Sequence, residues 1–325
     1  MPDLPQWAHF MTGPERLRAF EDGVRRALAA REVEFQVDLP GGLASLRAPD
    51  GRRVELGLGS LARHWHGLEG AAEGGEGDAM IDAHFSALWT RAMHPDPALE
   101  ARLDQLEFAG PLLRVWLITE RRAVTEAEGL VQRRLAKGLH AILVLDLPTS
   151  VRPVDPARLS AWGRGSGPGA SLPELWARAQ AQTLAALTGE ERPTAQRLRL
   201  FGQLACLALT GDSLFVTSAL LGLDAVIDSS STALPELGAL VVAPTHHTLL
   251  VHTLDAPLNE ATMATLLSGF QKAAASLYEQ GPASLSPELY WWRGGALEHV
   301  RAGRDGFGRL VLGASEAFLE EVVSG

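Results

Sequence analysis

The sequence predicts an α+β protein whose sheets are mostly antiparallel and flanked by helices. Three observations support this prediction. Short apolar or alternating segments are joined by two-residue turns that contain glycine, as in β-hairpins. In other segments apolar residues recur at three- and four-residue spacing, which predicts amphipathic helices. The connections between strand segments are too short for the helical crossovers of a doubly wound parallel sheet.

Residues 1–97 predict an N-terminal α-β-β-β-α-α unit. Pro14 suits the first turn of a helix, and apolar residues at Leu17, Phe20 and Val24 carry its buried face to about residue 30. The other elements are expected as follows: strands at 34–39, 43–48 and 53–58, helices at 60–68 and 78–93, and a glycine-rich loop at 70–77.

Residues 98–325 predict a larger α+β domain, either as one body or as two packed parts, 98–190 and 191–325. Ser171 followed by Glu174 is a capping-box pattern and predicts a helix start. Strands are expected at 112–118, 130–135, 140–147, 197–201, 204–209, 240–243, 248–254, 288–293 and 296–301. Helices are expected after Pro156 and at 171–187, 218–223 and 259–278.

The charge of the chain excludes some partner classes. It carries 39 acidic and 29 basic residues, a formal net charge of −10, so the basic footprint of a nucleic-acid or membrane-surface binder is missing. The first residues lack a basic leader, and no apolar stretch reaches the roughly 20 residues of a membrane span. We therefore expect a soluble cytoplasmic protein. Its one cysteine, Cys206, lies in an apolar run and is expected to be a buried structural thiol.

Five segments, in order along residues 15–305, resemble the YtpQ-like family of uncharacterised bacterial proteins, a domain of unknown function. They are 54–61, 141–146 with 150–154, 174–179, 240–244 and 285–292. The chain departs from the family where Thr245-His246-His247 replaces a charged pair after a proline. The resemblance implies a fold and a compartment, and it implies no activity.

The candidate metal ligands are His64, His66 and Asp82. Two histidines and a carboxylate could hold zinc or non-haem iron. On a helix, however, positions two residues apart point in different directions, so the two imidazoles would not easily reach one ion. Half-buried or solvated side chains are the alternative interpretation.

The candidate catalytic residues are His246, His252 and Asp255, with Ser213 as a nucleophile. His246 and His252 are expected to share one face of a hairpin, so a Ser-His-Asp arrangement can be drawn. No nucleophile-elbow sequence accompanies it. The glycine-rich run at 163–169 follows a predicted helix, which favours a surface loop over a nucleotide site. No cofactor is expected.

The candidate partner-binding residues are Trp291 and Trp292. Neighbouring residues on a strand point to opposite faces, so at least one ring is expected outside the core unless a helix covers it. Together these observations favour a non-catalytic binding or adaptor protein with a protein partner. The alternative is a metal-dependent or Ser/His hydrolase.

Overall fold

A computed structural model gives the structure of the chain. It describes residues 11, 13–31, 34–38, 43–47, 53–58, 61–62, 65–66, 68, 75–93, 97–126, 129–147, 150–164, 170–200, 204–228, 234–280, 284–304 and 310–324. The chain divides into two units. The first comprises residues 1–101 and 279–283, and the second comprises residues 102–278 and 284–325. The fold class is α+β, as the sequence predicts.

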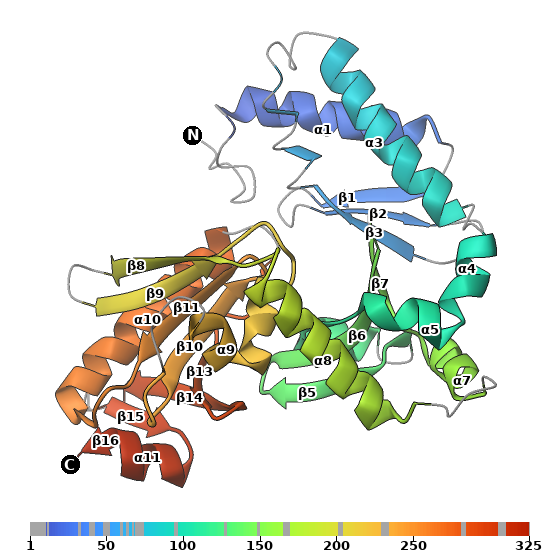
Figure 1. Cartoon of the computed structure of the whole chain (residues 1–325). Helices are drawn as coiled ribbons and strands as arrows, with labels where there is room; N and C mark the ends of the chain where they lie inside the picture. The colour runs from blue at the N-terminus through green and yellow to red at the C-terminus, as the bar shows by residue number, and fades with distance from the viewer. Residues whose placement is uncertain are drawn as a thin grey trace. The chain divides into compact units, whose positions relative to one another are not determined.

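The first unit places two helices against a three-stranded antiparallel sheet, ordered β1-β2-β3 (Figure 1). Its elements are α1 (Pro14–Ala29), β1 (Phe35–Asp38), β2 (Leu43–Arg47), β3 (Arg53–Gly57) and α3 (Gly75–Met93). Proline occupies the first turn of α1, and Phe20 and Val24 on its apolar face are fully buried. The glycine-rich loop ends earlier than predicted, because α3 begins at Gly75. Residues 41–42, 50–51 and 71–74 lie outside the described part.

The second unit begins within α4 (Pro97–Leu103). Its remaining helices are α5 (Leu106–Ala109), η2 (Gly110–Leu112), α6 (Glu120–Thr125), α7 (Pro156–Arg164), α8 (Leu172–Thr188), η4 (Val216–Leu221), α9 (Leu223–Asp228), α10 (Glu260–Gln280) and α11 (Glu316–Val322). Its strands are β4 (Leu113–Thr119), β5 (Gln132–Ala136), β6 (Leu139–Leu147), β7 (Ser150–Pro153), β8 (Thr194–Leu200), β9 (Leu204–Thr210), β10 (Ala239–Thr245), β11 (Thr248–Thr253), β12 (Leu258–Asn259), β13 (Leu289–Arg293), β14 (Ala296–Arg304), β15 (Leu310–Gly313) and β16 (Val323–Ser324).

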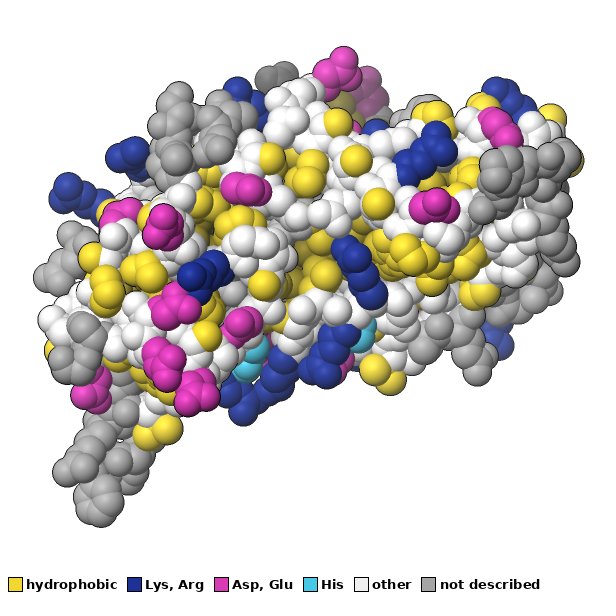
Figure 2. Space-filling view, turned by 60° about the horizontal axis from the view of Figure 1, so that its bottom comes forward, with side chains coloured by type: hydrophobic (Ala, Val, Ile, Leu, Met, Phe, Trp, Pro, Cys, Tyr) yellow, Lys and Arg dark blue, Asp and Glu magenta, His cyan; other side chains and the backbone are white. Residues whose placement is uncertain are grey.

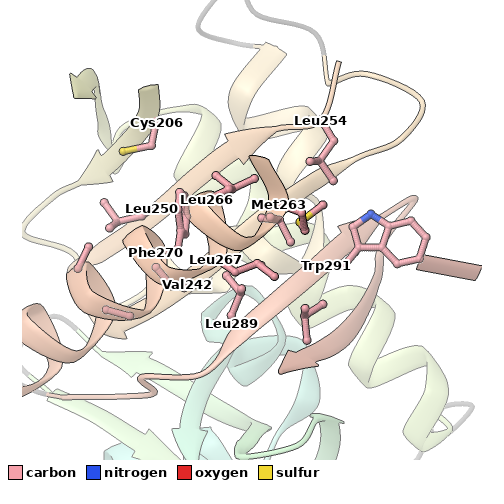
Figure 3. Packing of buried hydrophobic residues seen from close by; sticks show 14 of the residues in the cluster. Cys206, Val242, Leu250, Leu254, Met263, Leu266, Leu267, Phe270, Leu289 and Trp291 are labelled. Carbon is pink, nitrogen blue, oxygen red and sulfur yellow. The ribbon is translucent and has the colours of Figure 1, made fainter. Parts of the chain in front are cut away.

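A seven-stranded sheet, wholly antiparallel, forms the body of this unit in the order β15-β14-β13-β10-β11-β9-β8. Its central strand β10 is buried along its whole length, because both faces of the sheet are covered. Helix α10 covers one face, where Met263, Leu267 and Phe270 pack onto the strands (Figure 3). Two short strands, β12 and β16, form a parallel pair that the sequence did not predict.

A second sheet has four strands, with β4 on one side of β6 and with β5 and β7 also pairing with β6. Helix α8 packs on β4 and begins with the predicted capping box, in which Ser171 and Glu174 bind each other's backbone N–H. The segment η4 is fully buried and contacts α8, β4 and β11, so it joins the two sheets into one unit. None of the helices in the described residues is both long and apolar enough to cross a bilayer.

Candidate functional site

The predicted metal ligands do not come together in the described part of the first unit. Asp82, exposed on α3, forms an ion pair with Arg31, with 3.0 Å between Oδ1 and Nη1. His66 is half-buried. His64 lies outside the described residues, so its pairing with His66 stays a prediction. Across the described ranges, no three His, Cys, Asp or Glu side chains are grouped as metal ligands.

His246 is a buried structural residue in the turn between β10 and β11. Its Nδ1 accepts a hydrogen bond from the indole N–H of Trp116 at 3.1 Å, and the ring centroids are 5.0 Å apart. Burial, with smaller contributions from the nearby His247 and Arg122, lowers the pKa of His246 from 6.5 to about 3. A neutral imidazole whose Nδ1 accepts this bond carries its proton on Nε2, so neither nitrogen has a free lone pair for a general base.

The other members of the predicted triad have separate partners. His252 on β11 places Nδ1 2.7 Å from the carbonyl oxygen of Ala205. Asp255 is exposed and forms no hydrogen bond to a histidine within the described ranges. Ser213 donates to a carboxylate oxygen of Glu191 at 2.5 Å. The described side chains therefore do not assemble the triad.

The prediction that His246 and His252 share a strand face is wrong. Strand β10 ends at Thr245, and its register shifts between Val242 and Thr245. His246 therefore lies in the turn and its ring contacts Trp116, whereas His252 lies on β11 and its ring contacts Phe270.

Of the two alternatives for Trp291 and Trp292, an exposed ring or a covered one, the structure supports the covered one. The side chains point to opposite faces as expected, but only 2% and 3% of their surfaces are accessible. Trp291 packs in the α10 cluster, and its N–H donates to the Leu237 carbonyl at 2.8 Å (Figure 3). Trp292 donates to the Leu220 carbonyl of η4 at 2.8 Å. Because both faces are covered, neither ring is available to a partner.

A buried hydroxyl pair that sequence reasoning missed connects the two sheets. The Tyr290 hydroxyl donates to the Lys137 carbonyl at 3.0 Å, and it lies 2.8 Å from the Ser286 hydroxyl. Burial is the main cause of a raised Tyr290 pKa, so the phenol stays protonated and keeps donating. Both hydroxyls are satisfied within the chain. This arrangement holds the β5–β6 turn in place and leaves no reactive group.

The strongest candidate for a binding surface is the outer edge of β8. This strand ends the seven-stranded sheet and pairs only with β9 among the described strands (Figure 1). Its seven residues are regular, without a register shift. Most of its side chains are exposed, and Leu198 is the half-buried one that packs against the α10 cluster. A strand edge of this kind presents unpaired N–H and C=O groups to an added strand.

The outer edge of β4 is closed by side chains. The N–H of Val115 donates to the Thr183 hydroxyl at 2.9 Å, and its carbonyl accepts from the Ser218 hydroxyl at 2.8 Å. These caps come from α8 and η4. No such cap appears on β8 within the described residues. The edge of β4 is therefore closed, whereas that of β8 is open. Of the two end strands of the seven-stranded sheet, β8 with seven residues is longer than β15 with four.

Arg197 and Arg199 are the charged groups on this edge. Both are exposed, and neither has an ion pair within the described ranges. The sequence signal for an edge strand was present in the alternation Arg197-Leu198-Arg199, because natural edge strands carry charges on the solvated face. The sequence predicted a strand at 197–201, but it could not show that this strand lies at the end of the sheet.

Comparisons with known proteins do not identify a relative of this chain. No family model matches this chain, and no curated protein or solved structure matches it either. The resemblance to the YtpQ-like family therefore stays a prediction.

Proposed function

We propose that this protein is a non-catalytic binding protein that captures an extended segment of a protein partner beside β8. One observation carries the proposal: β8 is a regular strand of seven residues whose outer edge pairs with no other described strand. Strand addition to an exposed sheet edge is a common mode of peptide recognition, in which backbone hydrogen bonds supply affinity.

The hydrolase alternative has less support. His246 has no free lone pair, Ser213 donates to Glu191, and Asp82 pairs with Arg31. A nucleic-acid partner is also disfavoured, because the net charge is −10. On the face in Figure 2, Lys and Arg side chains are interspersed with acidic and hydrophobic ones over most of the surface, and a small group lies together at the lower centre. The buried thiol of Cys206 agrees with a cytoplasmic location, which we also propose.

The test uses phage-displayed random dodecapeptides selected on the full chain. Selected peptides are expected to slow hydrogen exchange of the β8 amides when added as synthetic peptides. N-methylation of alternate peptide residues is expected to abolish binding, because it removes backbone donors that pair with β8. Peptides that protect another segment, or that tolerate every N-methylation, would overturn the proposal.

A pair of proline variants supplies the matched control. Ala195 and Gln196 are neighbours on β8, so one N–H points to β9 and the other points outward. Ala195→Pro and Gln196→Pro therefore separate the two edges. The variant with the outward N–H is expected to keep its melting temperature and lose peptide binding. Equal binding by wild type and both variants would count against strand addition.

A further inference from the structure

We infer that the segment captured beside β8 carries two carboxylate side chains two residues apart, which pair with Arg197 and Arg199. This inference rests on the proposed function and adds the chemistry of the partner. The partner is thus an extended acidic peptide rather than an apolar one.

The geometry places the two guanidinium groups on one face. Arg197 and Arg199 are two residues apart on a strand, so their side chains point to the same side of the sheet. Leu198, between them, points to the other side and packs against the α10 cluster. Opposite the arginines on β9 lie Leu207 and Ala205, which are half-buried and exposed. The arginines therefore stand on a solvated surface beside the free edge, where an added strand would place alternate side chains next to them.

The electrostatics favour carboxylates at those alternate positions. Some exposed arginines of the chain have acidic partners, as Arg26 pairs with Asp78 and Arg293 with Glu321. Others, such as Arg18 and Arg121, have none among the described residues, so it is the position of Arg197 and Arg199 beside an open strand edge that distinguishes them. Arg197 has none within the described residues, and neither does Arg199, although the chain has ten more acidic than basic residues. Opposite charges across neighbouring strands stabilise the pairing, and a guanidinium can bind a carboxylate with two parallel hydrogen bonds.

The same charges disfavour a second copy of the chain. The N–H and C=O groups of every second residue face outward from a strand. In a symmetric antiparallel pair of β8 strands, the residues opposite each other therefore have numbers that are both odd or both even. Full overlap is centred on Arg197, which would then face its own copy. A shift of one pair toward the C-terminal end of β8 would place Arg197 opposite Arg199. Like charges directly opposite each other destabilise strand pairing, so an acidic partner segment fits this edge better than self-association.

The experiment compares three synthetic peptides that share one strand-forming sequence except at two central positions, two residues apart. Both positions are Glu in the first peptide, Gln in the second and Lys in the third. Their affinities for the full chain are measured by fluorescence anisotropy at low and high salt. The Glu peptide is expected to bind about threefold to tenfold more tightly than the Gln peptide at low salt, since each exposed ion pair contributes modestly. This preference should shrink at high salt.

Two double variants, matched in charge, locate the effect. Arg197→Gln with Arg199→Gln is expected to remove the preference for the Glu peptide. Arg18→Gln with Arg121→Gln removes two exposed arginines from other elements and is expected to keep it. A preference that survives the β8 double variant would overturn the inference.

The outcomes separate this inference from the proposed function. If the Glu and Gln peptides bind equally and both protect β8 amides from exchange, strand addition stands and the acidic preference is wrong. If no peptide protects β8, the proposed function itself is wrong. Displacement of the peptide from β8 by single-stranded oligothymidine would overturn the choice of an acidic peptide. So would a dimer of the wild-type chain that forms with rising concentration and is not stabilised by the β8 double variant, because the arginines would then not oppose self-association.

Discussion

Trp116 and His246 lie 130 residues apart in the chain, and the indole N–H of Trp116 donates to Nδ1 of His246 at 3.1 Å. Trp116 belongs to β4 of the four-stranded sheet, and His246 belongs to the β10–β11 turn of the seven-stranded sheet. The bond requires the neutral imidazole, because a protonated ring has no acceptor. The contact between the two sheets therefore depends on the protonation state of one side chain.

We expect acid to destabilise the protein through His246. Its pKa is about 3 in the folded chain and 6.5 when exposed, so between these values the unfolded state binds a proton that the folded state does not. The neutral His246 therefore contributes fully to the free energy of unfolding above pH 6.5. Between pH 6.5 and about pH 3, this contribution falls by about 1.4 kcal/mol for each unit by which the pH drops. Urea unfolding at pH 7.5, 6 and 5 measures this slope.

The control is His246→Gln, whose amide oxygen can still accept from Trp116 but does not titrate. Its unfolding free energy is expected to depend less on pH than that of the wild type. Parallel slopes for the two proteins would show that His246 is not the group responsible.

We expect Tyr290→Phe to destabilise the second unit by about 1–3 kcal/mol. The substitution removes a buried hydroxyl and with it the hydrogen bonds to the Lys137 carbonyl and the Ser286 hydroxyl, and it leaves the Lys137 carbonyl without this donor. Thermal or urea unfolding checks the loss. The only other tyrosine of the chain, Tyr278, supplies the control: Tyr278→Phe is expected to change stability by less than about 0.5 kcal/mol. Equal effects of the two substitutions would contradict this role for the Tyr290 hydroxyl.

We expect the thiol of Cys206 to react slowly in the folded protein. Burial raises its pKa to about 11, so the reactive thiolate is scarce at neutral pH, and the side chain is only 6% accessible. Titration with Ellman's reagent at pH 8 should show slow release from the native chain and rapid release of one equivalent in guanidinium chloride. Fast reaction without denaturant would mean that β9 opens readily at this position.

We expect Trp292→Ala to act on stability, at a cost of about 3–5 kcal/mol, because it empties a buried site and leaves the Leu220 carbonyl without a donor. Peptides that bind at β8 should keep their affinity at temperatures where the variant remains folded. A variant of normal stability that loses peptide binding would restore Trp292 as a partner-binding residue.

Local patterns predicted much of the secondary structure. Two of the glycine-containing turns expected between strand segments are Lys137-Gly138 and Gly294-Gly295, and both are turns in the structure. Their glycines have positive φ values, 77° at Gly138, 52° at Gly294 and 84° at Gly295. The capping box at Ser171 and the apolar face of α10 are confirmed. Short elements such as α6, α11 and β15 were missed, because a few residues carry too little periodicity to be recognised.

The candidate sites were less predictable, because they depend on sheet order. Trp291 and Trp292 alternate as a strand requires, yet a segment about 70 residues away, η4, covers one of the two faces. His246 was expected to share a face of the hairpin with His252, but it lies in the β10–β11 turn, where its ring contacts Trp116, whereas the His252 ring contacts Phe270. Neither the cover over the tryptophans nor these ring contacts have a local signature in the sequence.

The amino-acid sequence alone determined the α+β class, the glycine-containing hairpin turns and the capping box of α8, since each depends on residues within a few positions of one another. Only the tertiary structure decided which strand ends the large sheet, that both tryptophans are covered and that His246 is buried and neutral. Those properties depend on contacts between residues far apart in the chain. Burial, strand order and pKa are set by which segments meet, and that information is distributed over the whole chain.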